Sequence, residues 1–486
     1  MTLLTDTVKV RSTMDQRYRD DAVLVPAHWA KNGEAIAVGK NGGVDMAVFG
    51  GIPGEKCAVK ILHEGQHMVF GIWKKAMPRH SERVTPSCEH YEQCGGCPLM
   101  HVSRQEQFRA LDSTLKNILL EEGISDVPVM PIVPSPAGPL GYRHVTKLTV
   151  SISDRGSPRI GAPGRRRHIV PIPECGVITP LLRDIMRTIF HLFIDMEVRP
   201  WFEGEGLLRH LVLRQSSWTN EVMVTLVAGG GPPILEEMAA NISGKHPEVV
   251  GVHLHINKEE GNAIFVPDES GAIRTKHILG KKLIDEKVGG VIYQVGPGDF
   301  FQTNPSMANR ITEDVIKFAG LKKGVPFLDL YCGVGGFALA GAKVAGWALG
   351  VETVDGAVDR ARSNASLNGI PAEFISGNVL MVLEDVQLRL RGKHPVIVVN
   401  PSRRGLEEGV IDAMMELNPS RIVYVSCNPA SLGRDIRELQ RHGMVPREFH
   451  PYEMFPNTPH QEVVAILDHP DRPIVASRGP RRKVVR

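Results

Sequence analysis

Cys427 and Glu462 are the two residues whose types and surroundings best suit covalent and acid–base chemistry. Cys427 follows Arg421-Ile-Val-Tyr-Val-Ser426, a run typical of a buried strand, and precedes Asn-Pro and an expected helix. A thiol at such a strand end faces the ligand cleft of an α/β sheet, where backbone N–H groups favour the thiolate. The alternative is a packed cysteine without reactivity.

Glu462 begins the otherwise apolar run Glu462-Val-Val-Ala-Ile-Leu467. Burial of its carboxyl group would raise the pKa toward that of a usable general base. The alternative is a charge in water at the edge of a strand. His460, two residues earlier, could point to the same side, although such histidines are more often structural.

A glycine-rich loop, Asp329-Leu-Tyr-Cys-Gly-Val-Gly-Gly336, indicates a nucleoside-binding site. The loop lies between an expected strand and an expected helix, and its glycines allow a ligand close approach to the backbone. Glu352 follows sixteen residues after Gly336 and could accept hydrogen bonds from both ribose hydroxyls. The loop lacks the G-x-G-x-x-G spacing and a phosphate-binding lysine, so S-adenosylmethionine fits better than a dinucleotide.

Four of the seven cysteines suggest a metal site. Cys88, Cys94 and Cys97 lie within ten residues, and Cys175 stands in a proline-rich loop that could supply a fourth ligand. Thiolates at this spacing bind either zinc or an iron–sulfur cluster, and the spacing alone does not separate the two. The remaining alternative is chance clustering.

The composition is that of a globular protein with several domains. The chain has 486 residues, 42% of them hydrophobic and 23% charged, and a net charge of +3. No apolar run approaches the roughly 20 residues that span a bilayer. We expect a cytoplasmic, monomeric protein that does not bind a membrane. Basic runs at Arg165–Arg167 and in the C-terminal tail are either solvated charge or contacts to RNA phosphates.

The expected architecture is multidomain α/β. Five short strand-like runs separated by glycines predict a small β-barrel of the oligonucleotide-binding kind, with an SH3-like module as the alternative. Strands and helices that alternate from residue 325 predict a mostly parallel, doubly wound sheet. The predicted divisions are disorder over 1–17, the barrel over 18–79, a central α+β domain over 80–295, a Rossmann-like domain over 296–468 and a basic tail over 469–486. A helix over 101–122 could pack on either the central domain or the Rossmann-like domain.

Six motifs in order resemble those of the RNA uracil carbon-5 methyltransferases, and the likeness runs from about residue 18 to residue 467. They are Cys88-x5-Cys94-Gly-Gly-Cys97 with Cys175, Phe300-Phe-Gln302-Thr-Asn, Asp329-Leu-Tyr-Cys-Gly-x-Gly, Asn400-Pro-Ser-Arg, Ser426-Cys-Asn-Pro and Met454-Phe-Pro-x-Thr-x-His-x-Glu462. The resemblance implies a TRAM RNA-binding barrel, a central domain with a four-iron four-sulfur cluster, and a class I S-adenosylmethionine-dependent methyltransferase domain.

The resemblance also implies roles for individual residues. Cys427 would be the nucleophile that adds to carbon 6 of uracil, and Glu462 the base that removes the proton from carbon 5. The implied cluster ligands are Cys88, Cys94, Cys97 and Cys175. The resemblance implies that Gln302, Tyr331 and Glu352 bind the cofactor and that Asn400 lies beside it. Gly333 and Gly336 of the glycine-rich loop, and Asn378 after an expected strand end, are further candidates from their positions. The target base must be unstacked to expose carbon 6, and Phe300 or Phe301 could stack on it.

The sequence departs from the family pattern at two positions. Asn400 replaces an aspartate that is frequent there, so position 400 cannot act as an acid or base, and Gly336 replaces a polar residue found in some members. The expected reaction is methylation of a uridine in structured RNA, with 23S rRNA as the expected substrate, because in the family that the sequence resembles the added barrel and cluster go mostly with ribosomal substrates. The alternatives are a tRNA uridine-5-methyltransferase, a noncatalytic RNA-binding factor with the same fold, and a zinc-containing methyltransferase with another acceptor.

Overall fold

The computed structural model describes residues 22–39, 43–153, 156–165, 168–201, 204–259, 261, 263–268 and 273–472. The predicted disorder over 1–17 and nearly all of the predicted basic tail lie outside the described residues. The chain forms two compact units. The first unit comprises the described parts of Met1–Ile118, Gly164–Arg166 and Phe455–His460, and the second unit the rest. We describe each unit separately.

The first unit is built on a six-stranded sheet with the order β1-β5-β6-β4-β3-β2. Its strands are β1 (Ala22–Leu24), β2 (His28–Trp29), β3 (Ala35–Ala37), β4 (Asp45–Phe49), β5 (Cys57–Glu64) and β6 (Met68–Ala76). Alternation of apolar and polar residues along β5 directs Cys57 and Val59 into a core that also contains Val48. All five predicted strands are present, and β2 is an additional short strand.

Helix α1 (Arg104–Glu121) follows the sheet, slightly shorter than the predicted 101–122. Its apolar residues recur at helical spacing, and Leu111, Leu115 and Ile118 are buried. The same unit contains the later segment Phe455–His460. The Gln107 side chain binds this segment, because its amide nitrogen lies 3.3 Å from Asn457 Oδ1 and its oxygen accepts from Asn457 N at 3.3 Å.

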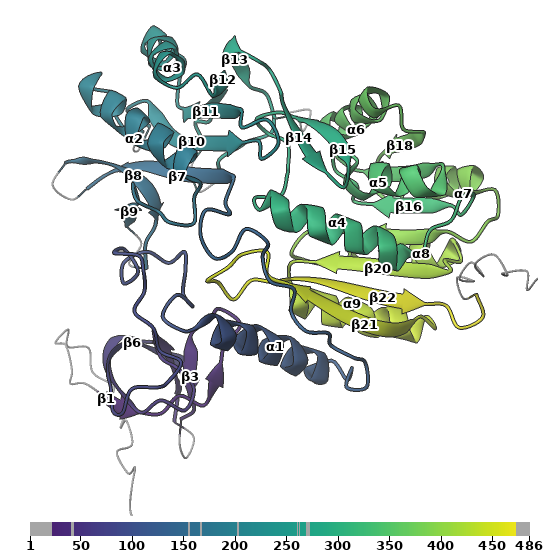
Figure 1. The fold of residues 1–486 in the computed structure, drawn as a ribbon, viewed down its shortest axis with the longest axis horizontal. Helices are drawn as coiled ribbons and strands as arrows, with labels where there is room; N and C mark the ends of the chain where they lie inside the picture. The colour runs from purple at the N-terminus through teal and green to yellow at the C-terminus, as the bar shows by residue number, and fades with distance from the viewer. Residues whose placement is uncertain are drawn as a thin grey trace, which may run out of the picture. The chain divides into compact units, whose positions relative to one another are not determined.

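The second unit contains a mixed seven-stranded sheet with the order β13-β12-β11-β10-β7-β8-β9 (Figure 1). Its strands are β7 (Val145–Ile152), β8 (Pro158–Pro163), β9 (Ile169–Pro171), β10 (Leu208–Gln215), β11 (Val222–Ala228), β12 (Val249–Ile256) and β13 (Lys276–Gly280). Helices α2 (Pro180–Asp195) and α3 (Pro233–Lys245) pack against β10 and β12 respectively. The sequence predicts strands over 147–152, 207–214, 221–227 and 249–256 and helices near 177–195 and 232–243, and β7, β10, β11, β12, α2 and α3 confirm them. Strands β8, β9 and β13 were not predicted.

A hairpin of β14 (Ile284–Val288) and β15 (Val291–Val295) leads into the last sheet, whose order is β18-β17-β16-β19-β20-β22-β21. Its strands are β16 (Phe327–Leu330), β17 (Ala348–Glu352), β18 (Ala372–Ser376), β19 (Val396–Val399), β20 (Arg421–Ser426), β21 (Val445–Tyr452) and β22 (Glu462–Asp468). Its helices are α4 (Pro305–Ala319), α5 (Gly336–Ala345), α6 (Asp355–Asn368), α7 (Leu383–Leu390), α8 (Val410–Glu416) and α9 (Pro429–Arg441).

Strands β16 to β20 are parallel, as predicted, whereas β22 runs antiparallel to both β20 and β21. Parallel strands with helices on both faces are buried throughout, and all four residues of Val396–Val399 are inaccessible. The observed fold is therefore mixed α/β with several sheets. The domain boundaries at residues 79, 295 and 468 remain predictions, as does the identification of the first sheet as a TRAM barrel.

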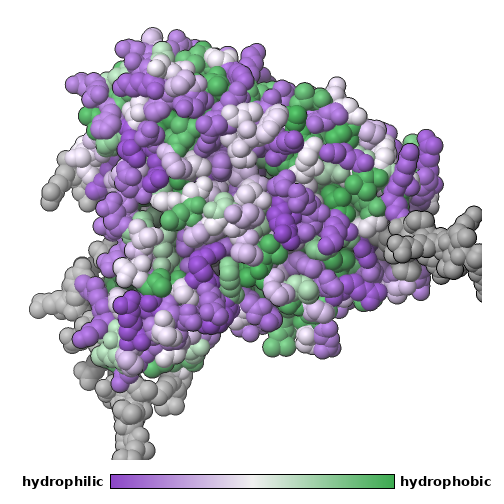
Figure 2. Space-filling model, in the orientation of Figure 1, coloured by the Kyte–Doolittle hydropathy of each residue, from purple (hydrophilic) through white to green (hydrophobic). Residues whose placement is uncertain are grey.

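The face of the molecule in Figure 2 is mostly hydrophilic, with apolar residues in small scattered patches. Among the described residues, no helix combines the length and the apolar character needed to cross a membrane.

Candidate active site

Cys427 and Glu462 lie at the facing ends of two neighbouring strands. Strands β20 and β22 are antiparallel and pair Ser426 with Val463. In this register, the position after Ser426 faces the position before Val463, so Cys427 stands opposite Glu462. Residues directly opposite in an antiparallel pair have Cβ atoms about 5 Å apart. Cys427 is half-buried, and Glu462 is only 3% exposed. The register of this strand pair therefore brings together the two residues expected to carry the chemistry.

Burial sets the protonation behaviour of both groups. Loss of water raises the pKa of Glu462 to about 7, although the positive charge of Arg403 opposes the rise. Burial and the negative charge of Glu462 raise the pKa of the Cys427 thiol, again opposed by Arg403 through its charge and a side-chain hydrogen bond. A backbone hydrogen bond at Cys427 lowers the pKa of the thiol, as expected, but burial and Glu462 outweigh it.

Arg403 is a site residue to which the sequence reasoning gave no role. It lies in the loop after β19, three residues beyond Asn400, and its guanidinium is exposed. The backbone of this loop is fixed to the turn that carries Cys427, because Asn428 Nδ2 donates to Arg403 O at 2.7 Å. The signal was present in the Asn400-Pro-Ser-Arg motif, which could have marked Arg403 as a cation near the thiol.

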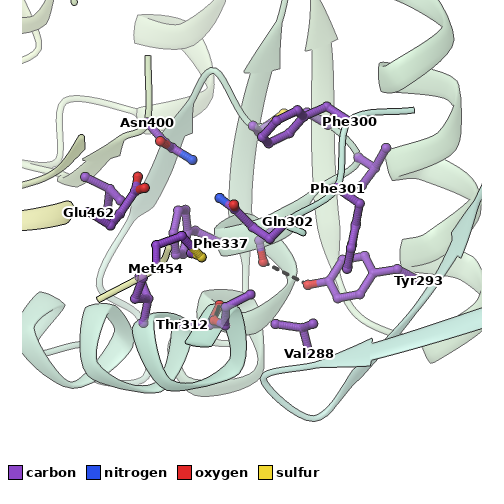
Figure 3. A pocket seen from close by; sticks show the side chains of 17 residues that line it. Val288, Tyr293, Phe300, Phe301, Gln302, Thr312, Phe337, Asn400, Met454 and Glu462 are labelled. Carbon is purple, nitrogen blue, oxygen red and sulfur yellow. Dashed lines mark hydrogen bonds between the residues drawn. The ribbon is translucent and has the colours of Figure 1, made fainter. Parts of the chain in front are cut away.

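A pocket of about 100 Å³ opens beside Glu462. Figure 3 shows Gln302, Asn400 and Glu462 pointing toward the same space, with Phe337 and Met454 between them. The lining is largely apolar, which suits binding of a ligand with few charged groups. The lining residues are Val288, Tyr293, Phe300, Phe301, Gln302, Ala308, Ile311, Thr312, Cys332, Gly333, Val334, Gly336, Phe337, Asn400, Val425, Met454 and Glu462.

Asn304 holds two sides of this pocket in place. It caps α4, since its side-chain oxygen accepts from Met307 N at 3.3 Å. Its side-chain nitrogen donates to Met454 O at 3.0 Å and to Ser135 Oγ at 3.1 Å. Asn304 is fully buried, so these bonds position Gln302 and Met454 without competition from water.

The glycine-rich loop has the geometry of a strand-to-helix ligand turn. Gly335 has φ = 94°, a left-handed conformation that glycine adopts without strain. The buried Asp329 carboxylate accepts from Ala338 N at 2.7 Å at the N-terminus of α5. Gly333 N donates to Glu352 Oε2 at 3.0 Å, which joins the loop to the end of β17. Tyr293 supports the loop from below, because its hydroxyl donates to Gly336 O at 2.8 Å (Figure 3).

The predicted cofactor residues divide into two groups. Gln302, Gly333, Gly336 and Asn400 line the pocket together with Glu462. The pocket lining does not include the other three predicted cofactor residues, Tyr331, Glu352 and Asn378. It also does not include Cys427, the candidate nucleophile. Glu352 is nevertheless bonded to Gly333, whereas the Asn378 side chain donates to Glu407 Oε2 at 3.0 Å.

The cysteines of the 88–97 loop are of intermediate exposure. Burial raises the pKa of Cys88, and Cys94 adds to this rise. The described residues contain no group of three or more His, Cys, Asp or Glu side chains arranged to hold a metal ion. Cys175, the other predicted ligand, belongs to the second unit.

Comparison with known proteins identifies close resemblances over most of the chain. A family model described as tRNA (uracil-5-)-methyltransferase matches residues 271–469. An uncharacterized RNA methyltransferase of Geobacter sulfurreducens is 32% identical, covering 93% of this chain and 94% of its own length. One of Caldanaerobacter subterraneus subsp. tengcongensis is 31% identical, covering 90% and 95%.

A solved structure has the same fold. The Pyrococcus abyssi tRNA (uracil-54, C5)-methyltransferase, determined in complex with S-adenosyl-L-homocysteine, superposes with a TM-score of 0.71 at 27% identity. The match covers 92% of this chain and 100% of the archaeal one.

Proposed function

Because this chain belongs to the family of S-adenosylmethionine-dependent RNA (uracil-5-)-methyltransferases, we propose that it methylates a specific uridine through a covalent bond between Cys427 and carbon 6 of the base. The observation that carries the proposal is the register of β20 and β22, which sets Cys427 opposite the buried Glu462 at the edge of the pocket.

The chemistry needs both groups. Carbon 5 of uracil is too weak a nucleophile to attack an alkyl group unaided. Addition of the Cys427 thiolate to carbon 6 forms an S–C bond and pushes an electron pair toward oxygen 4, so that carbon 5 becomes an enolate carbon. S-adenosylmethionine, when bound, supplies an electrophilic methyl group on a sulfonium.

Glu462 completes the cycle. Once carbon 5 carries a methyl group, its proton must leave before the cysteine can. A carboxylate with a pKa of about 7 can accept this proton at neutral pH. The electron pair of the C–H bond then re-forms the 5,6 double bond, the S–C bond breaks and the thiolate of Cys427 is regenerated.

The cofactor residues follow from the pocket and the loop beside it. Gln302, Gly333, Gly336 and Asn400 line the pocket, and a ligand there would contact them directly. Glu352 accepts a single hydrogen bond on Oε2, from Gly333, which leaves that oxygen able to accept from a ribose hydroxyl. Tyr331 and Asn378 complete the proposed set, and their support is the resemblance of the motifs alone.

The proposed target is an unstacked uridine in 23S rRNA. Phe300 is 76% exposed at the rim of the pocket, where its ring could stack on an extruded base. A tRNA uridine is the second candidate, and the family description and the archaeal relative support it.

Incubation with labelled S-adenosylmethionine and separated ribosomal and transfer RNA lacking the modification distinguishes the two targets, because label appears as 5-methyluridine in one pool. Label in neither would contradict the proposal.

A four-iron four-sulfur cluster on Cys88, Cys94, Cys97 and Cys175 is also proposed, with zinc as the alternative. Thiolates are the preferred ligands of both. Nε and Nη2 of Arg165 are buried and have no hydrogen-bond partner among the described residues, and Tyr91, Glu34, Cys94 and Cys97 all favour its protonated form. Iron and zinc analysis of anaerobically purified protein, with its visible absorbance, decides between the two metals.

The release of the RNA adduct is predicted to depend on pH with a midpoint near 7. The pKa of Glu462 is raised to about 7, so the carboxyl group is protonated below this pH and cannot accept the carbon-5 proton. The covalent adduct should accumulate at pH 6 and disappear by pH 8. Denaturing gels of quenched single turnovers measure it, and an adduct fraction independent of pH would argue against Glu462 as the base.

Replacement of Arg403 with glutamine is expected to slow methylation at pH 7.5 by about 10- to 100-fold, since loss of the cation would raise the pKa of both Cys427 and Glu462. The pH profile should move to higher pH, and Arg403→Lys should restore part of the rate. The exposed Arg404→Gln is the matched control. Loss of rate without a shift of the profile would mean that Arg403 acts on structure alone.

A further inference from the structure

Arg214 of β10 holds the start of a short segment that lines the pocket. Three consecutive residues of this segment belong to the pocket lining, namely Phe300, Phe301 and Gln302 (Figure 3). Arg214 Nη2 donates to the carbonyl of the preceding residue, Asp299 O, at 2.7 Å. The Asp299 carboxylate accepts from Gly296 N at 2.7 Å and from Arg360 Nε of α6 at 3.3 Å. All of these residues belong to the second unit, so the arrangement is internal to it.

Arg214 is a buried cation whose charge is matched by carboxylates. The residue is only 8% exposed. Burial lowers the pKa of its guanidinium to about 10, and the charges of Asp299 and Glu286 oppose this change, so the group stays protonated at neutral pH. A hydrogen bond from a charged donor is stronger than one from a neutral donor, and exclusion of water strengthens it further. The bond to Asp299 O therefore attaches the segment firmly to the central sheet.

A second, smaller cavity lies beside the same segment. Its volume is about 10 Å³, and Arg214, Phe301 and Gln302 are among its lining residues. Phe301 and Gln302 line both cavities, so Arg214 lies next to two residues that shape the pocket. A cavity of this size holds at most one water molecule, which leaves the segment little room to shift while Arg214 is in place. Shortening of the Arg214 side chain would enlarge the cavity and allow Phe301 and Gln302 to move into it.

We propose that Arg214 and Arg360 are positioning residues for the cofactor site, which hold Asp299 from β10 and from α6 and thereby set the place of Gln302 in the pocket. The inference deepens the proposed function and rests on it, because Gln302 is there a residue that contacts S-adenosylmethionine. Neither arginine is among the residues that line the pocket. Supporting contacts of this kind keep a binding side chain in its productive geometry, and a small displacement of that side chain weakens binding.

Replacement of Arg214 with glutamine should weaken the binding of S-adenosylmethionine by about 10-fold, because Gln302 is no longer held in place. Arg214→Lys keeps the charge without the fork of donors, so it should restore part of the affinity. Arg360→Gln should weaken binding by about 3-fold only, since its ion pair with Asp299 is longer and the arginine side chain is a quarter exposed.

The matched control is Arg209→Gln. Arg209 is another arginine of β10 that is 8% exposed, and it also holds a loop. Its side chain donates to Asn257 Oδ1 at 3.0 Å and to Gly261 O at 2.6 Å, and neither of these residues lines the pocket. Arg209→Gln should therefore lower the stability of the protein and leave the affinity for S-adenosylmethionine at the wild-type value.

Calorimetric titration of the full-length protein with S-adenosylmethionine measures the dissociation constant, at a temperature at which thermal denaturation shows each variant to be folded. Loss of stability alone does not change this constant in a folded variant, so the constant separates positioning from a merely structural role. Wild-type affinity in Arg214→Gln, or an equal loss in Arg209→Gln, would overturn the inference. If Arg214→Gln does not fold, Arg360→Gln decides: weaker binding supports the inference and wild-type binding refutes it. Wild-type protein that binds S-adenosylmethionine but methylates no RNA would instead contradict the proposed function.

Discussion

Replacement of Cys427 with serine should abolish uridine methylation, with turnover lowered by at least about 10⁴-fold. Serine keeps nearly the same size at the end of β20, so the fold should be unaffected. Its hydroxyl has a far higher pKa than a thiol and is a much weaker nucleophile, and carbon 6 would therefore not be attacked. Transfer of labelled methyl groups to RNA measures the loss.

The matched control is Cys57→Ala, which removes a fully buried thiol from the core of the first unit. It should cost about 1 kcal/mol of stability and leave methylation unchanged at a temperature where the protein is folded. Methylation by Cys427→Ser at more than a few per cent of the wild-type rate would exclude a covalent role for the thiol. An inactive Cys57→Ala protein that is folded would mean that thiol loss acts indirectly.

Replacement of Glu462 with glutamine should slow turnover by about 10²- to 10⁴-fold and trap the enzyme on its RNA. Glutamine is isosteric, but its amide cannot accept the carbon-5 proton. Addition of Cys427 and methylation of carbon 5 do not require this carboxylate, so the reaction should stop at an adduct that survives denaturation. Gel electrophoresis in denaturant would show the protein–RNA species.

Burial makes this substitution favourable for folding, because an amide in this apolar site costs less than an ionised carboxylate. Loss of activity in Glu462→Gln would therefore not reflect unfolding. Glu448→Gln, on the neighbouring strand β21, changes a half-buried carboxyl group that lies 2.8 Å from His450 Nε2, and it should leave turnover and adduct level at wild-type values. Rapid turnover by Glu462→Gln, or a slow variant with free RNA only, would remove Glu462 from the base role.

The local elements could be predicted well from the sequence because their signals are short in range. Alternating burial identified the strands of the first sheet, and apolar residues at helical spacing identified α1. The strand-glycine-helix pattern around Gly335 identified the loop, since a left-handed turn there requires glycine. The hairpin of β14 and β15 was missed although Gly289-Gly290, between its two strands, is a two-residue turn signal.

The arrangement of the site could not be predicted from physical reasoning alone. Cys427 and Glu462 are 35 positions apart, and their juxtaposition depends on the antiparallel pairing of β20 with β22 at one edge of a sheet that was expected to be mostly parallel. Burial is the main cause of the raised pKa of Cys427, and the charge of Glu462, which this register sets opposite the thiol, adds to the rise. The motifs placed both residues in the site only through their resemblance to a family.

For Arg165, unlike Cys427 and Glu462, no sequence motif indicated the surroundings that the structure shows. Its position in a run of basic residues suggested a solvated or phosphate-binding charge, and no local signal indicated otherwise. Long-range pairing of Gly164 with Cys94 brings it onto the Phe49 ring. Contacts between segments about 70 residues apart determine its surroundings, and sequence patterns do not encode such contacts.

The most direct test of the central claim uses wild-type protein and substrate RNA in which 5-fluorouridine replaces uridine. Addition to carbon 6 and methylation of carbon 5 can proceed, but carbon 5 then carries fluorine in place of the proton that Glu462 would remove. The account predicts a stable protein–RNA adduct, and mass spectrometry of its peptides should find a methylated fluorouracil bonded to Cys427. Absence of an adduct under conditions where uridine RNA is methylated, or a bond to another residue, would contradict the account.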